Sequence, residues 1–194
     1  MRNIDKFIHP IEPLVMWGQG FSSEECDSIL QLGELAEFKK AAIGDGVTDD
    51  KVRNTKIVWI EPSPDTYWVF DRMNELCGKI NFDKFQLDLK QFDGFQYTKY
   101  EVDSHYDWHI DTINNPTNGL FRKLSFVLML TDPSEFEGGD LLLNSDGNVD
   151  HCHKVTFNKG DLAVFYSHIP HKVTPVTTGT RVTLVTWARG PKLV

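Results

Sequence analysis

The stretch GDLAVFYSHIPHKVTPVTTGTRVTLVTW, residues 160–187, is the strongest indication of the fold class of this chain. It contains three short apolar segments, at 161–166, 172–176 and 181–187, which are separated by Ser, Pro and Gly turn signals. Segments of this length and composition are typical of β-strands. Because residues i and i+2 of a strand point to the same face, the last segment would present four residues on one face. These are Arg181, Thr183, Val185 and Trp187.

Similar short segments precede this stretch from about residue 84 onward. Gly, Pro, Asn and Asp interrupt them, as expected for strands that are joined by tight turns. The expected strands are residues 85–89, 95–100, 105–110, 124–130, 140–143, 154–157, 161–166, 172–176 and 181–187. A run of about eight short strands after helices predicts a mainly β fold with flanking helices, a small sandwich or a jelly roll.

The first part of the chain has the periodicity of helices. Ser22 precedes Glu25 by three residues, which is the spacing of a capping box. A second helix is expected to begin at Ser63-Pro64, with Ser as the cap and Pro at the first helical position. The apolar residues at helical intervals are Cys26, Ile29, Leu30, Leu32, Leu35 and Phe38 in the first helix and Trp68, Phe70, Met73, Leu76 and Ile80 in the second. We expect one domain over 1–194, with a helical support region (1–83) and a jelly-roll core (84–194).

Composition excludes several classes of protein. The chain has 194 residues and a net charge of −8, with 20 Lys and Arg against 28 Asp and Glu, which disfavours non-specific nucleic-acid binding. Its apolar runs are only strand-sized, and the N-terminal residues lack the apolar core of a signal peptide. Three scattered cysteines without a CxxC pair argue against a disulfide framework or a thiolate zinc site. We therefore expect a cytoplasmic protein without nucleic-acid or membrane partners, of undetermined oligomeric state.

Three separated residues fit a metal site. His109 and Asp111 are two residues apart on an expected strand, so both side chains would reach one ion. His-x-Asp is common by chance, and a third ligand is needed. His171 follows an apolar strand 62 residues downstream of His109. Two His and one carboxylate form the facial triad of Fe(II) oxygenases, which leaves open coordination positions.

An arginine follows the third candidate ligand by ten residues. Arg181 and Thr183 lie on one face of an otherwise apolar strand, where a guanidinium fork and a hydroxyl suit a carboxylate ligand. Taken alone, Arg181 fits an internal ion pair or a solvent-facing position better. The complete set, His-x-Asp, then His171, then Arg181, is much more specific than any of its parts.

This set resembles the catalytic core of the Fe(II)/2-oxoglutarate-dependent dioxygenases. Within them it is most similar to the prolyl 4-hydroxylases, especially the bacterial PKHD-type branch. The resemblance rests on YEVDSHYDWHID (100–111), LSFVLMLTDPSEFEGGDLL (124–142) and the stretch 160–187. It implies a double-stranded β-helix, or jelly roll, supported by N-terminal helices. The cofactors that it implies are Fe(II), 2-oxoglutarate, O₂ and, in addition, ascorbate.

The resemblance also implies a role for each matching residue. His109, Asp111 and His171 match the iron ligands and would form the catalytic centre. The matches in the 2-oxoglutarate site are Arg181 for the distal carboxylate, Thr183 as its assistant, Tyr100 as a co-substrate contact and Trp187 as a pocket wall. Arg122 and Tyr106 match positions near the peptide-substrate entrance. Met129 departs from the Tyr of animal oxygen-sensing prolyl hydroxylases, and Arg181 departs from the Lys of collagen-type enzymes.

The implied reaction is hydroxylation of an unactivated C–H bond with release of succinate and CO₂. The implied substrate is a proline-containing peptide or protein, hydroxylated at C4 of a prolyl residue and held in a groove between residues 112–120 and 44–50. Hydroxylation of a free amino acid or another small molecule stays open as an alternative. From other classes, a catalytically silent jelly-roll binding module and a zinc hydrolase with the same ligands also stay open.

Other histidines also have spacings in the sequence that could suggest metal ligands. His151-Cys152-His153 lacks a matched third ligand and is expected at a strand end or on the surface. The spacing to Arg181 favours His171 over His168 as the ligand. His105 precedes His109 by four residues, but the extended pattern around it argues against a helical pair of ligands.

Overall fold

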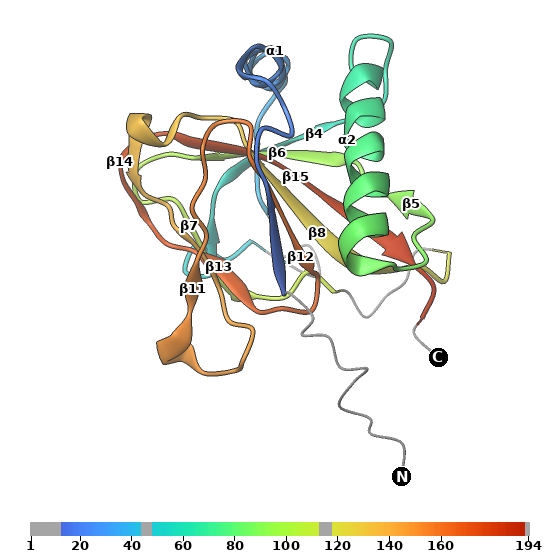
Figure 1. Cartoon of the computed structure of the whole chain (residues 1–194). Coiled ribbons are helices and arrows are strands. Elements are labelled where there is room, and N and C mark those ends of the chain that lie inside the picture. The colour runs from blue at the N-terminus through green and yellow to red at the C-terminus, as the bar shows by residue number, and fades with distance from the viewer. Residues whose placement is uncertain (1–12, 44–47, 113–117, 193–194) are drawn as a thin grey trace.

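Two antiparallel β-sheets face each other in this protein, and two α-helices cover the outer face of the larger sheet. The structure, a computed structural model, describes residues 13–43, 48–112 and 118–192. Figure 1 shows α2 along one side of the larger sheet and the strands β7, β11 and β13 of the smaller sheet on the other side. This arrangement confirms the predicted mainly β, jelly-roll architecture.

The larger sheet has the strand order β1-β12-β8-β15-β6-β4-β2, with β5 paired to β15. Its strands are β1 (Leu14–Trp17), β2 (Lys39–Lys40), β4 (Lys56–Ile60), β5 (Gln91–Phe92), β6 (Phe95–Tyr100), β8 (Phe121–Met129), β12 (Leu162–Tyr166) and β15 (Arg181–Gly190). The central strand β15 pairs with β6 on one side and with β8 on the other. The sequence pattern therefore located the middle of this sheet correctly.

The smaller sheet has the order β11-β10-β13-β7-β3, and a separate pair joins β14 to β9. The strands of this sheet and of the pair are β3 (Arg53–Asn54), β7 (His105–His109), β9 (Phe136–Gly138), β10 (Leu141–Leu143), β11 (His153–Lys154), β13 (His171–Val173) and β14 (Val176–Gly179). In the register of β13 against β7, His171 lies directly opposite His109. Strand pairing therefore brings together two residues that are 62 positions apart.

Helix α1 (Ser23–Glu34) begins as predicted, because Ser22 and Glu25 form a complete capping box. It ends at Glu34 and does not continue to Phe38. The Phe38 ring still packs beside Tyr97, with ring centroids 5.9 Å apart, so its apolar character is used outside the helix.

Helix α2 (Tyr67–Ile80) begins later than predicted, so Ser63 as its cap is wrong. The backbone amides of Thr66 and Tyr67 both donate to the Ser63 carbonyl, which makes residues 63–66 a turn ahead of the helix. The hydroxyl of Thr66 donates to the carbonyl of Glu61. Because residues 63–66 form this turn, the helix does not begin at Ser63-Pro64 as the motif predicted.

The predicted strand at 85–89 is also wrong. Helix α2 passes into a π-helix, η2 (Asn81–Phe85), and Gln86 then adopts a positive φ of 52°. The Asn81 side chain bonds both backbone groups of Leu87, so the segment is tied to the helix end and not to a sheet. Alternating apolar residues here pack against the core without strand pairing. Two further short helices in the described part of the chain are the 3₁₀ turns η3 (Pro133–Glu135) and η4 (Val149–His151).

Residues before position 84 also contribute strands, which the helical interpretation of 1–83 omitted. Strands β1, β2 and β4 extend the larger sheet, and β3 extends the smaller one. The division into a support region and a core at residue 83 stays a prediction.

Each face of the larger sheet has its own hydrophobic core. On the outer face, Val182 and Leu184 pack with residues of α1 and α2 such as Ile29 and Met73. On the inner face, Met129 and other apolar residues pack between the two sheets. The alternation along β15 thus gives one face to the helices and the other face to the space between the sheets.

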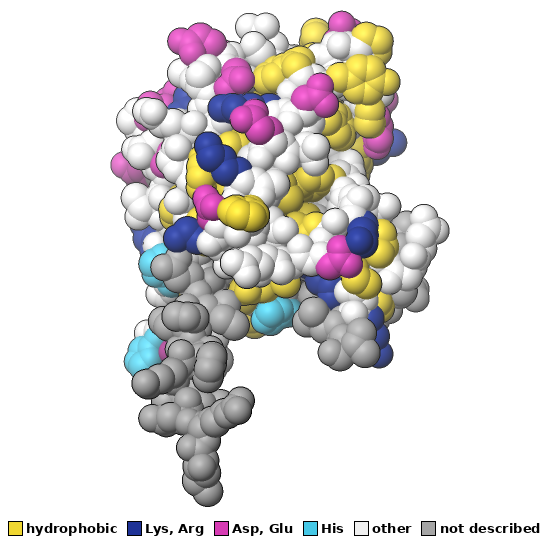
Figure 2. All heavy atoms as spheres, turned by 45° about the vertical axis from the view of Figure 1, so that its right-hand side comes forward, with side chains coloured by type: hydrophobic (Ala, Val, Ile, Leu, Met, Phe, Trp, Pro, Cys, Tyr) yellow, Lys and Arg dark blue, Asp and Glu magenta, His cyan; other side chains and the backbone are white. Residues whose placement is uncertain are grey.

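The surface mixes charges of both signs. Figure 2 shows acidic and basic side chains interspersed on one face, with hydrophobic side chains gathered toward its upper right. Among the described residues, none of the helices combines the length and the apolar character that a membrane span needs. The three cysteines form no disulfide in this described part of the chain.

Candidate functional site

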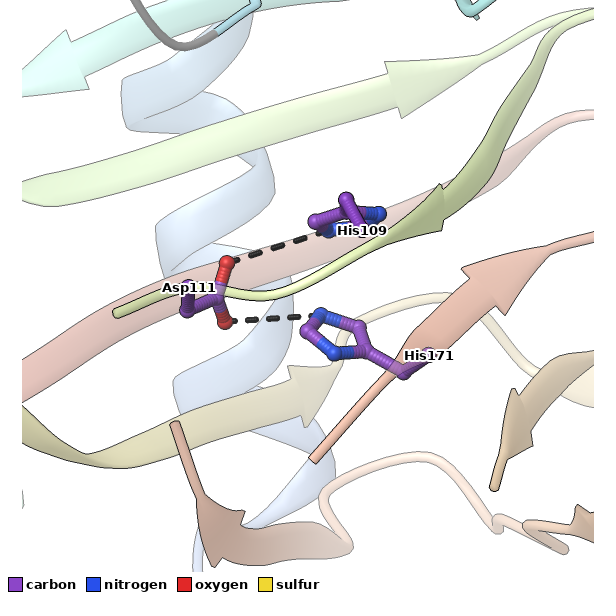
Figure 3. Close-up of side chains that lie close together, drawn as sticks. All are labelled: His109, Asp111 and His171. Carbon is purple, nitrogen blue, oxygen red and sulfur yellow. Dashed lines mark ion pairs between the residues drawn. The ribbon is translucent and has the colours of Figure 1, made fainter. Parts of the chain in front are cut away.

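His109, Asp111 and His171 form a compact cluster of ligand atoms. One ligand atom from each residue lies within 4.8 Å of the other two. His109 ends β7, Asp111 follows it, and His171 begins β13. Asp111 Oδ1 lies 3.7 Å from His109 Nε2, and Asp111 Oδ2 lies 3.4 Å from His171 Nε2. Figure 3 shows the three side chains pointing toward one another.

Backbone carbonyls fix the tautomer of both imidazoles. Nδ1 of His109 lies 2.8 Å from the Asp107 carbonyl oxygen, and Nδ1 of His171 lies 2.9 Å from that of Ile169. A carbonyl only accepts, so each Nδ1 carries the proton and donates it. Nε2 of each ring is thereby left as the ligand atom that faces the centre of the cluster.

Two buried serines orient the carboxylate. The Ser125 hydroxyl donates to Asp111 Oδ2 at 2.7 Å and lies 3.0 Å from the Ser167 hydroxyl. The backbone amide of Asp111 donates to the Ser167 carbonyl at 2.8 Å. Supporting hydrogen bonds of this kind hold a ligating carboxylate in one orientation.

Burial and mutual charge set the protonation of the cluster. Burial, followed by the neighbouring charge of His171, lowers the pKa of His109 to about 3, so this ring is neutral. Burial alone would raise the pKa of Asp111, but the charge of His171 and its hydrogen bond outweigh burial and hold that pKa below its usual range. Burial likewise opposes a charged His171, but Asp111 overrides it and raises the pKa of His171.

A cavity of about 360 Å³ opens beside the cluster, between the two sheets. All nine site residues that the sequence predicted line it: Tyr100, Tyr106, His109, Asp111, Arg122, His171, Arg181, Thr183 and Trp187. Thr98 of β6 and Ile57 of β4 extend the same wall beyond Thr183, because the three strands are in register there. The predicted face of β15 is therefore one wall of this cavity.

Arg181 has buried, open hydrogen-bond donors that suit an anion. Its side chain is 1% exposed, and its Nε and Nη2 have no hydrogen-bond partner among the described residues. The buried Thr183 hydroxyl lacks a partner in the same way, and the Tyr100 ring lies 5.0 Å from the guanidinium carbon. Burial lowers the pKa of Arg181, but a guanidinium stays charged in a protein. Because a buried cation with open donors is costly, a carboxylate ligand fits this end of the cavity.

The wall and rim of the cavity carry a second arginine. Arg122 lies over the Trp187 ring, with its guanidinium carbon 3.7 Å from the ring centroid. Its Nε donates to Asp93 Oδ2 at 2.8 Å, and Asp93 also accepts from Arg189. The bond to Asp93 thus fixes the Arg122 side chain through its Nε. Ile110, which is 51% exposed, also lines the cavity.

Sequence reasoning missed several residues of this site. Arg53, Trp59 and Gln96 line the cavity, and Ser125 supports Asp111. The β-branched and aromatic run 52–60 carried a strand signal that could have located β3 and β4. The hydrogen bond of Ser125 had no signal in the sequence.

The alternative histidines lie elsewhere. His168 is exposed beside Tyr166, and His105 contacts the backbone of Asp103 and Lys51. His151 pairs with Asp146 on the surface. Met129 packs in the core between the sheets. The predicted peptide groove depends on residues 44–47 and 113–117, which lie outside the described residues.

Residues 95–189 match the family model of the 2OG-Fe(II) oxygenase superfamily. They include the complete cluster and Arg181. This segment, which is about half of the chain, belongs to that superfamily. For a 2OG-Fe(II) oxygenase, the cofactor and co-substrates are Fe(II), 2-oxoglutarate and O₂, and the His-Asp-His cluster provides the iron-binding triad.

Curated relatives agree with this membership. The chain is 36% identical over 94 residues to the PKHD-type hydroxylase YbiX of Escherichia coli O6:K15:H31, and equally to that of Escherichia fergusonii. The match covers 47% of this chain and 40% of those proteins. The chain therefore spans well under half the length of the curated relatives it matches.

Solved structures share the fold of this chain. A Pseudomonas putida prolyl-4-hydroxylase aligns with a TM-score of 0.73 at 23% identity, over 92% of this chain and 93% of that one. A Trichoplax adhaerens prolyl hydroxylase, solved with a hypoxia-inducible-factor peptide fragment, aligns with a TM-score of 0.72 at 20% identity, over 91% and 83%. These likenesses extend over the N-terminal region as well as the core.

Proposed function

We propose that this oxygenase hydroxylates a prolyl residue of a peptide or protein at C4, with conversion of 2-oxoglutarate to succinate and CO₂. The observation that carries the proposal is the joint presence, in one cavity, of the His109-Asp111-His171 triad and the open donors of Arg181. The triad fits a metal ion, and the guanidinium fits the far carboxylate of a dicarboxylic oxo acid.

The triad residues would hold the metal through His109 Nε2, His171 Nε2 and the Asp111 carboxylate. Bound Fe(II), with 2-oxoglutarate and O₂, supplies the oxidising chemistry that turns an unactivated C–H bond into a C–OH group. The three protein ligands leave further coordination positions for the co-substrates. Ser125 and the carbonyls behind the imidazoles keep the ligand atoms aimed at one point.

Arg181, Thr183 and Tyr100 would orient 2-oxoglutarate. A charge-assisted pair between Arg181 and the distal carboxylate, assisted by the Thr183 hydroxyl, would satisfy donors that otherwise stay unpaired in a buried wall. The other end of 2-oxoglutarate, which carries the keto group and the second carboxylate, would then face the triad across the cavity. Val127, Val185 and Trp187 line the same space and would limit the entry of water.

The prolyl peptide is supported by the rim of the cavity. Trp59 offers an aromatic face there, of the kind that docks polyproline-like segments. Trp59 is 42% exposed and Arg122, which lines the same cavity, is only partly buried, so both are available to a chain that crosses the rim. The Trichoplax adhaerens neighbour is described in complex with a peptide fragment, which supports a peptide partner in general.

An anaerobic titration with Fe(II) and 2-oxoglutarate tests the metal and oxo-acid assignment. We expect the weak visible charge-transfer band in the wild type and its loss in His171→Ala. Arg181→Ala should need about 10–100-fold more 2-oxoglutarate, because a charge-assisted hydrogen bond is lost. The controls are His168→Ala and Arg72→Ala, which remove the same side chains outside the cavity and should keep the band. A folded, iron-loaded wild type without the band contradicts the proposal.

Succinate formation tests the substrate. We expect proline-containing peptides to stimulate it and to gain one oxygen atom, about 16 mass units, on a prolyl residue. Stimulation by free proline or another amino acid, and not by peptides, would assign the alternative small-molecule activity. An iron-loaded protein that shows the band but turns over no 2-oxoglutarate with any of these compounds would favour a silent binding module.

A further inference from the structure

Arg53 is a buried cation in the cavity wall that lies outside the residues matched by the family model. It is 7% exposed and belongs to β3, the short edge strand of the smaller sheet. In the register of β3 against β7, Arg53 lies opposite Tyr106. A buried arginine is rarely placed without a structural or functional partner.

Three uncharged acceptors hold the Arg53 guanidinium in one orientation. Its Nε donates to the Thr55 hydroxyl at 3.0 Å, its Nη1 to the Ala42 carbonyl at 3.1 Å and its Nη2 to Gln96 Oε1 at 2.7 Å. Gln96 belongs to β6 of the larger sheet, so Arg53 links the two sheets beside the cavity. The positive charge is thus positioned without being neutralised by these bonds.

Arg53, Tyr106 and the metal ligand His109 are layered on one another. The Arg53 guanidinium carbon lies 4.4 Å from the Tyr106 ring centroid. The Tyr106 ring lies on the His109 imidazole with centroids 3.5 Å apart and an interplanar angle of 12°. We name this arrangement the Arg53–Tyr106–His109 stack. Strand β3 and the amide of Asp107, which donates to the Val52 carbonyl at 2.8 Å, keep its layers side by side.

The layering restricts a motion that the hydrogen bond of His109 leaves open. The bond from Nδ1 to the Asp107 carbonyl fixes one atom of the imidazole, and the ring can still tilt about it. A flat ring against one face of the imidazole removes this freedom. A cation on the far face of Tyr106 in turn fixes the Tyr106 ring, since the guanidinium is attracted to the π face.

We infer that Arg53 and Tyr106 are positioning residues that hold His109 in the orientation needed for metal binding. The inference rests on the proposed metal site. It adds a second support for the His109 imidazole, to which Arg53 of the N-terminal region contributes. Neither residue touches the metal in this scheme. Both act through the plane of His109, so their loss should weaken metal binding and alter the ligand field.

Metal binding by the full-length metal-free protein tests the inference, with Co(II) as the probe. In Tyr106→Leu and Arg53→Met we expect the Kd for Co(II) to rise about tenfold or more, as when other supports of metal ligands are removed. The visible Co(II) absorption bands should change in both variants. Tyr106→Phe keeps the ring and should restore the wild-type Kd and spectrum.

A matched control separates positioning from general stability. Arg189→Met removes an equally buried arginine, 5% exposed and bound to Asp93, that is not part of the stack. It should lower the Tm of the metal-free protein and leave the Co(II) Kd unchanged. Tyr106 is only half-buried, so Tyr106→Leu carries the test even if Arg53→Met does not fold.

Two results would overturn the inference, and they differ. If the wild type binds Co(II) and Tyr106→Leu binds it within twofold of the same Kd with an unchanged spectrum, the stack is only structural and the proposed function stands. If the wild type binds neither Co(II) nor Fe(II), the proposed metal site fails and the inference falls with it.

Discussion

In the metal-free cluster, the ionised Asp111 favours the protonated form of His171. Asp111 raises the pKa of His171 above its ordinary value, against the effect of burial, while the pKa of Asp111 itself stays below its usual range. His109 is neutral over the same conditions, because its pKa is lowered to about 3. Only an unprotonated imidazole ligates a metal, so binding must release the proton of His171.

Metal affinity should therefore depend on pH through one proton. Below the raised pKa of His171, the Kd for Co(II) or Fe(II) should increase about tenfold for each unit by which the pH falls, and above it the Kd should level off. Calorimetric titrations in buffers of different ionisation enthalpy should report release of about one proton. A Kd that does not change over roughly pH 5 to 8 contradicts the assignment of this proton to His171.

At the scale of elements, helix α1 approaches the larger sheet at a glycine. A Cβ added to Gly33 would lie 2.3 Å from an atom of the Tyr97 ring, which is fully buried beneath the helix. Gly78 in α2 is the opposite case, since a Cβ there would meet no described atom within 4 Å. Helix propensity favours alanine at both positions, so packing decides the difference between them.

Gly33→Ala should destabilise the protein, and Gly78→Ala should stabilise it. Overpacking against Tyr97 costs roughly 1–3 kcal/mol, which exceeds the gain of about 1 kcal/mol in helix propensity. The free energy of unfolding from urea titration measures both effects, and Gly78→Ala serves as the control for propensity alone. If both substitutions raised the free energy of unfolding by the same amount, α1 would not be packed on Tyr97 as described.

At the scale of the whole molecule, the outer core isolates two thiols from solvent. Cys26 and Cys77 lie between the helices and the larger sheet. Burial raises the pKa of Cys26 to about 11 and that of Cys77 to about 12. Cys152 is half-buried and lies outside both cores.

One thiol should consequently react much faster than the other two. We expect a disulfide reagent to modify Cys152 readily in the native protein, because reaction needs an accessible thiolate. Cys26 and Cys77 should react only as fast as the molecule unfolds, and all three should react at once in denaturant. Cys152→Ser provides the control, and rapid modification of this variant under native conditions would show that the outer core opens locally.

Local patterns in the sequence determined most strands from residue 95 onward, the capping box at Ser22 and the face of β15 that carries Arg181. They missed β9, and they merged β13 with the start of β14 into one strand at 172–176. The correct predictions succeeded because strand alternation and helix caps depend on residues only a few positions apart. The iron triad was also predictable, since its residue types and spacing restrict the chemistry strongly. The same local reasoning failed at Ser63 and at 85–89, where bonds to the Ser63 carbonyl and the Asn81 side chain override the local signal.

Only the tertiary structure decided the pairing of His171 with His109, the serine behind Asp111, and the Arg53–Tyr106–His109 stack. Strand register and the burial of polar groups join positions that are tens to more than a hundred residues apart along the chain. Such contacts depend on which surfaces exclude water together, a property of the packed sheets that no short stretch of sequence contains.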